Sequence, residues 1–129
     1  MAVKVGYTTF DCIDPRAVAE FWAKALSYEI DAPNEAGGEV LLNDPKGGEP
    51  SLGFMKVSES KMVKNRVHLD LMVTDGSLEE EVDRLVAAGA RAIETLQDPD
   101  GFVDPVIWTV MHDPEGNEFC VIEEMSRRP

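Results

Sequence analysis

RVHLDLMVTDGSLEEEVDRLVAAG, residues 66–89, carries two different periodicities in succession. Apolar and polar side chains alternate through 66–74, a pattern typical of a β-strand that has one covered face. Ser77 then stands at a helix N-cap, Glu80 follows three residues later to complete a capping box, and Gly89 ends the helical spacing of apolar residues. This stretch therefore predicts a strand that leads directly into an amphipathic helix.

The first part of the chain repeats this plan. Residues 3–11, VKVGYTTFD, are strand-like, and Asp14-Pro15 opens an amphipathic helix, because aspartate caps a helix and proline suits its first turn. Aligning Asp14 with Asp75 at the two helix starts lays one half of the chain over the other. The sequence therefore indicates an internal duplication.

The duplication continues beyond each helix. DPKGGE at 44–49 and DPEGNE at 113–118 are both predicted turns, since proline fixes one backbone dihedral and glycine allows a left-handed one. Strands are predicted at 28–33, 39–43 and 50–57 in the first half, and at 90–95, 106–111 and 118–125 in the second. The fold class is therefore α+β, with two βαβββ modules in tandem in a single domain, 1–129. Module one is 1–57, a polar connector is 58–65 and module two is 66–129.

The single helix of each module covers one face of its sheet and leaves the other face open. We expect the two modules to form a curved sheet around a cleft, lined by residues that point away from the helices. Alternation assigns Leu69, Leu71 and Val73 to the helix side. The cleft side receives His68, Asp70 and Met72 and, by alignment of the two halves, Tyr7, Thr9 and Asp11. Trp108 is a further candidate, because an indole ring stacks on planar or cationic ligands.

The chain has 129 residues and a formal net charge of −13. This charge excludes nucleic acids and anionic membranes as partners, because phosphate binding needs clustered cations. A cationic small molecule would be attracted, although the simplest role of the charge is to keep the protein soluble. Two cysteines without metal-type spacing, and no apolar leader or membrane span, are typical of a cytoplasmic, bacterial-type protein.

Three stretches carry a family resemblance: FDCIDPRAVAEFWAKALSYE at 10–29, KNRVHLDLMVTD at 64–75 and VIWTVMHDPEGNEFCVIE at 106–123. Together they resemble the vicinal oxygen chelate superfamily, and within it the glyoxalase-like domain subgroup. The superfamily includes glyoxalase I, extradiol dioxygenases, and the bleomycin and fosfomycin resistance proteins. The resemblance covers nearly the whole chain and implies the paired-module fold.

The resemblance also implies where a divalent metal would be bound. Metal-dependent relatives hold the ion with a His, Gln or Glu in the first strand of each module and a Glu in the last strand. Those places fall here on Tyr7, His68 and Cys120, while the matching place in 50–57 offers no good ligand. Two ligands are too few for a hard ion, so the metal site is predicted to be lost. Zinc held by His68, Cys120 and a nearby carboxylate such as Glu123 is the alternative.

His68 and Cys120 each have two interpretations. His68 can act as a general acid or base with Asp70, two positions along the same face, or it can bind a ligand or a neighbouring side chain. Cys120 can be a nucleophile if a neighbour lowers its pKa, although a small buried hydrophobe is the favoured interpretation. His112 adjoins the turn at 113–118 and is expected at the surface.

Three functions remain open from the sequence. The first is a metal-free small-molecule-binding protein of the resistance or sequestration type, whose predicted ligand contacts are Tyr7, Thr9, His68, Met72, Trp108 and Cys120. The second is a metal-independent lyase, isomerase or hydrolase that uses His68, with Asp70 or Tyr7, as acid and base. The third is a metal-dependent glyoxalase or dioxygenase relative. No cofactor is predicted, and a homodimer is expected, as in many two-module relatives.

Overall fold

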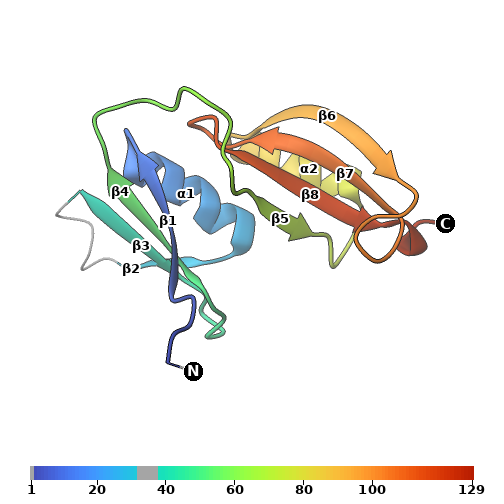
Figure 1. Cartoon of the computed structure of the whole chain (residues 1–129), viewed down its shortest axis with the longest axis horizontal. Coiled ribbons are helices and arrows are strands. Elements are labelled where there is room, and N and C mark those ends of the chain that lie inside the picture. The colour runs from blue at the N-terminus through green and yellow to red at the C-terminus, as the bar shows by residue number, and fades with distance from the viewer. Residues whose placement is uncertain (1, 32–37) are drawn as a thin grey trace. The chain divides into compact units, whose positions relative to one another are not determined.

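The computed structural model describes residues 2–31 and 38–129 (Figure 1). The chain divides into two compact units, Met1–Lys61 and Met62–Pro129, and in the described part of each there is a four-stranded sheet and one α-helix. Among the described residues, none of the helices is long and apolar enough to cross a membrane. The α+β class and the two similar modules in tandem are confirmed, and both sheets are open.

The first unit contains β1 (Tyr7–Cys12), α1 (Pro15–Leu26), β2 (Glu29–Asp31), β3 (Glu39–Asn43) and β4 (Ser51–Lys56). Its strand order is β1-β4-β3-β2, with β1 parallel to β4 and the other pairs antiparallel. Helix α1 packs on one face through Trp22, whose ring centroid lies 5.4 Å from that of Phe10. Phe10 in turn stacks on Phe54 at 5.1 Å, so an aromatic cluster forms the core of this unit.

Local signals set the ends of α1. The Asp14 side chain accepts a hydrogen bond from the Ala17 N–H at 3.2 Å, which satisfies one of the free donors of the first turn. At the other end, Ser27 adopts a left-handed conformation with φ 57°, and its N–H donates to the Ala23 carbonyl. The sequence alone indicated the aspartate cap and the proline at the helix start.

The second unit repeats the arrangement with β5 (Leu69–Met72), α2 (Leu78–Ala88), β6 (Arg91–Asp98), β7 (Val106–His112) and β8 (Glu118–Glu124), followed by the 3₁₀ turn Met125–Arg127. Its strand order, β5-β8-β7-β6, matches the first unit element by element. Ser77 caps α2 by accepting from the Glu80 N–H at 3.2 Å. The Glu80 carboxylate accepts from the Ser77 hydroxyl, so the predicted pair forms between these side chains.

Two first strands are shorter than the sequence predicted. β1 begins at Tyr7 rather than at residue 3, because its partner β4 begins opposite it at Ser51. Val3 and Val5 are exposed, so the apolar alternation there does not reflect a ladder. β5 covers Leu69–Met72 rather than 66–74, which leaves His68 just before the strand. The predicted strand 28–33 is confirmed as far as Asp31, and its last two residues lie outside the described part.

Candidate functional site

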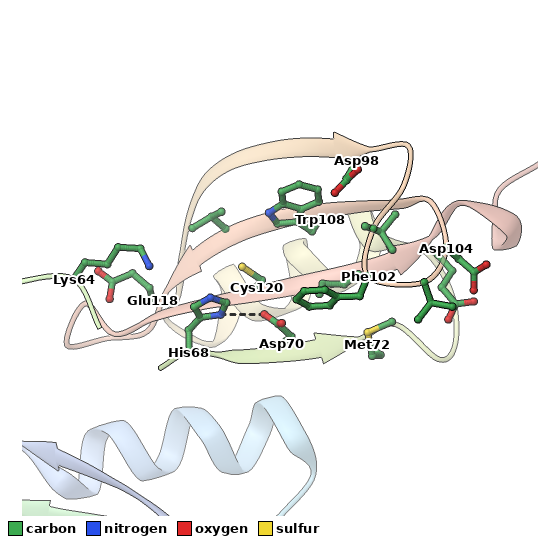
Figure 2. Close-up of a pocket in the computed structure, with 16 residues that line it drawn as sticks. Lys64, His68, Asp70, Met72, Asp98, Phe102, Asp104, Trp108, Glu118 and Cys120 are labelled. Carbon is green, nitrogen blue, oxygen red and sulfur yellow. Dashed lines mark hydrogen bonds and ion pairs between the residues drawn. The ribbon is translucent and has the colours of Figure 1, made fainter. Parts of the chain in front are cut away.

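A cavity of about 590 Å³ lies in the second unit, on the face of its sheet that is turned away from α2 (Figure 2). Its floor is largely apolar and comes from three neighbouring strands. The floor residues are Met72 from β5, Trp108 and Val110 from β7, and Cys120 and Ile122 from β8. The loop between β6 and β7 and the segment before β5 complete the lining.

The period-two alternation of the strands decides which side chains reach this cavity. Along β8, Phe119, Val121 and Glu123 are buried on the helix side. Cys120 and Ile122 therefore point to the other face, which is the pocket. β5 behaves as predicted, since Asp70 and Met72 line the pocket while Leu69 and Leu71 do not.

His68, Asp70 and Cys120 form a compact polar cluster in this pocket. Asp70 and Cys120 are directly paired across the β5–β8 ladder. His68 Nδ1 lies 3.0 Å from Asp70 Oδ1, and both side chains remain just over a third exposed. The potential ligand atoms of all three residues lie within 4.8 Å of one another. The contact between His68 and Asp70 that their spacing suggested is therefore present.

The surroundings of Cys120 disfavour its thiolate form. Desolvation by burial raises the pKa of this thiol, and the negative charge of Asp70 raises it further, against a smaller opposing effect of Lys64. A nucleophilic cysteine needs the opposite shift. Cys120 is also only half-buried and lies in the floor of the pocket, so the favoured interpretation of a small buried hydrophobe is wrong.

The prediction that Glu123 could serve as the third zinc ligand is wrong. Glu123 is buried on the helix side of β8, where its two oxygens accept from Arg127 at 2.8 Å and from Arg128 at 2.7 Å. Glu123 and Cys120 both lie on β8, where successive side chains alternate between the two faces of the sheet. An odd separation along the strand therefore places these two side chains on opposite faces. The carboxylate beside Cys120 belongs to Asp70.

The donors present do not fit the hard divalent ion of the metal-dependent relatives. Mg²⁺ and similar ions prefer several oxygen ligands, whereas the cluster offers an imidazole, a thiol and one carboxylate that already contacts the imidazole. In the first unit, the matching part of β4 provides Ser51, Leu52, Gly53 and Phe54, of which Leu52 and Phe54 are buried under α1. None of these four is a favoured ligand type for such an ion.

The remaining predicted site residues are divided between the two units. Trp108 and Met72 line the pocket together with the polar cluster. Tyr7 and Thr9 are exposed on β1 in the first unit and do not line this pocket. His112, expected at the surface, is half-buried at the end of β7 and outside the lining, and its Nδ1 lies 3.4 Å from the Arg91 guanidinium.

Sequence reasoning missed the loop between β6 and β7 and most of the charge of the pocket. Phe102 and Val103 in that loop reach the lining, as do five carboxylates against the single cation Lys64. These carboxylates are Asp70, Asp98, Asp104, Glu118 and Glu124. Alternation along β8 would have indicated Ile122 and Glu124, but the loop has no periodicity from which to read its orientation.

Comparison with known proteins identifies one matching family and several solved structures that share this fold. A family model described as glyoxalase-like domain matches residues 7–122. A glyoxalase/bleomycin resistance protein/dioxygenase family enzyme from Burkholderia phytofirmans has a TM-score of 0.76 at 19% identity, covering 95% of this chain and 100% of that one. No curated protein sequence matches the chain.

Two further solved structures have the same fold. A glyoxalase-related enzyme from Fulvimarina pelagi has a TM-score of 0.68 at 16% identity, covering 94% of this chain and 88% of that one. Lactoylglutathione lyase from Agrobacterium tumefaciens has a TM-score of 0.65 at 17% identity, covering 93% and 92% of the two chains. At these identities the structural likeness concerns the fold alone.

Proposed function

Because the chain belongs to the glyoxalase-like domain family, we propose that it is a small-molecule-binding protein whose ligand occupies the pocket of the second unit. The observation that carries this proposal is the cavity of about 590 Å³ with an apolar floor. Pockets of this size, lined mainly by apolar and aromatic side chains with a few convergent polar groups, are typical of small-molecule sites. Here the polar groups are His68, Asp70 and Cys120.

We propose a planar or cationic ligand. Trp108 offers an indole face in the floor, and the lining carries five carboxylates against one lysine. A cation near an indole face is attracted by the negative face of the ring, and the negative charge of the carboxylates attracts it further. The net charge of −13 supports the same preference at longer range.

We also propose that the protein works without the metal of its superfamily relatives. The mismatch between the donor set and a hard ion supports this part of the proposal. Zinc is the ion whose chemistry comes nearest to the cluster, since it accepts nitrogen, sulfur and oxygen ligands. Metal analysis of protein purified without chelator is expected to find no stoichiometric ion, and stoichiometric zinc would favour a metal-dependent function instead.

Ligand binding is tested by thermal unfolding with a panel of cationic, neutral and anionic aromatic compounds. A ligand at about 100 times its Kd should stabilise the protein by about 2.7 kcal/mol, which raises Tm by several degrees in a domain of this size. Trp108→Leu should reduce this shift, whereas Tyr28→Leu, outside the pocket, should retain it. If no class of compound raises Tm, the proposal fails.

A metal-independent lyase or isomerase is the second candidate, favoured by the 3.0 Å contact between His68 Nδ1 and Asp70 Oδ1. A carboxylate in this position orients an imidazole and leaves its second nitrogen for proton transfer. Lactoylglutathione, which the Agrobacterium relative's name contains, is a first substrate to test. Turnover that His68→Ala abolishes without loss of folding would establish catalysis.

We also propose a cellular compartment and an oligomeric state for the protein. The chain has two cysteines without metal-type spacing, and we propose a reducing, cytoplasmic compartment on the basis of this cysteine usage. A homodimer is proposed by analogy with two-module relatives, and sedimentation equilibrium would measure it.

A further inference from the structure

The loop at residues 99–105, between β6 and β7, presents its apolar side chains in an unusual way. Phe102 is 104% exposed and Val103 is 86% exposed, yet both line the pocket. A phenylalanine in contact with solvent forgoes the stabilisation that burial of such a side chain brings. In Figure 2 the Phe102 ring extends from the loop over the middle of the pocket. A bound molecule would give this ring an apolar surface to cover.

The conformation of the loop is specified by its own backbone. Gly101 has φ +61°, and a Cβ there would collide with the Asp104 carbonyl oxygen, so only glycine fits. Before the loop, Asp98 Oδ1 accepts from the Asp100 N–H at 2.9 Å. After it, the Met125 N–H donates to the Pro105 carbonyl at 2.9 Å. These contacts hold the loop backbone on both sides of Phe102.

The charges of the pocket are unevenly distributed along its length. Asp98 and Asp104 flank the loop at one end, and Lys64 lies at the other end beside Glu118 (Figure 2). The backbone N–H groups of Asp100 and then Gly101 lower the pKa of Asp98 from its ordinary value, so this carboxylate is ionised at neutral pH. The loop end of the pocket is thus the more negative end, and it adjoins the ring of Phe102.

We propose that the 99–105 loop, together with Asp98, is the selectivity element of the pocket. It holds the charged end of an organic cation whose planar apolar body lies between Trp108 in the floor and Phe102 above it. This inference rests on the proposed small-molecule function and specifies its ligand class as an aromatic ammonium compound. An anion with the same ring system is excluded by Asp98 and Asp104.

Three pyrene compounds with one ring system and different charges test this selectivity. These are 1-pyrenemethylammonium, 1-pyrenemethanol and 1-pyrenecarboxylate, titrated by fluorescence polarisation at fixed low salt. The ammonium compound should bind roughly tenfold more tightly than the alcohol, and the carboxylate more weakly still. The difference between ammonium and alcohol should shrink on addition of salt, because exposed charges are screened.

Matched variants locate the effect in the loop. Asp98→Asn with Asp104→Asn should remove most of the ammonium preference, whereas Asp83→Asn with Glu59→Gln changes the net charge equally, outside both the lining and the loop, and should preserve it. Phe102→Ala should weaken all the compounds that bind by roughly tenfold, with Ile93→Ala, an exposed residue outside the pocket, as the control.

Each other outcome has a definite meaning. Equal binding of the ammonium and the alcohol would overturn the inference and leave the proposed function standing. Absence of binding by these probes and by the wider thermal panel would overturn both. A change of oligomeric state in Phe102→Ala with unchanged affinities would identify the loop as a protein interface and also overturn the inference.

Discussion

The Cys120 thiol faces the Asp70 carboxylate across the β5–β8 ladder, and this pairing governs its reactivity. Because burial and then Asp70 raise the pKa of the thiol, little thiolate exists at neutral pH. Cys12 is only 1% exposed, so it should react little with an alkylating reagent. The thiol that the family resemblance aligns with a metal-ligand position is therefore mainly neutral at pH 7, and it lies in the floor of the pocket.

We expect iodoacetamide to alkylate Cys120 more slowly than free cysteine at pH 7.5. Asp70→Asn should accelerate the reaction by roughly two- to tenfold, since it removes the negative charge that raises the pKa of the thiol. Asp83→Asn, outside the pocket, is the matched control. Mass spectrometry of the modified peptide measures the rate, and alkylation faster than that of free cysteine would identify an activated thiol.

Glu123 is the other residue whose neighbours define its role. It is 2% exposed and receives hydrogen bonds from Arg127 and Arg128, which attaches the end of the chain to the second sheet. Arg128 also bonds to Glu79 of α2 at 2.6 Å, and Arg127 to the Gly76 carbonyl. This network explains why a buried carboxylate is tolerated on the helix side of β8.

Removal of the Glu123 carboxylate should destabilise the fold, because Arg127 and Arg128 both lose the acceptor to which they donate. Glu123→Ala is expected to lower the free energy of unfolding by about 3 kcal/mol, measured by urea denaturation. Glu124→Ala, the next residue on the exposed face, should change it by less than about 0.5 kcal/mol. Equal effects of the two substitutions would show that the network does not stabilise the fold.

At the scale of elements, α2 depends on its N-terminal cap. Its burial is modest, with Leu78 and Leu85 as its buried residues, so the cap is a large part of its local stability. Ser77→Ala should destabilise the protein by about 1 kcal/mol, because the Glu80 N–H loses its acceptor. Ser60→Ala in the exposed connector is the control, and equal unfolding midpoints for the two variants would contradict the capping role.

Helices and strands were predicted with different success from the same sequence. Both helices begin where the sequence predicted, since the caps at Asp14 and Ser77 are local interactions. Strand ends were less predictable, because a strand ends where its neighbour does. β1 starts at Tyr7 for that reason, and β6 extends to Asp98 because β7 pairs with it as far as Val106.

On the scale of the whole molecule, the duplicated plan carries different side chains in its two units. The two sheets share one strand order, and yet the pocket described here is lined by residues of the second unit. The two units differ in sequence at matching places. His68 and Asp70 stand in the second unit where the first has Tyr7 and Thr9. Part of the acidic surplus of the chain lies at this pocket, which is lined by five carboxylates and one lysine.

The sequence by itself determined the two-module plan, the helix starts and the face on which His68, Asp70 and Met72 lie. These features depend on caps and on period-two alternation, which act between residues close in the chain. Only the tertiary structure decided that Asp70 lies opposite Cys120 and that Phe102 extends over the pocket. Strand register and loop path depend on contacts between distant residues, so no local pattern records them.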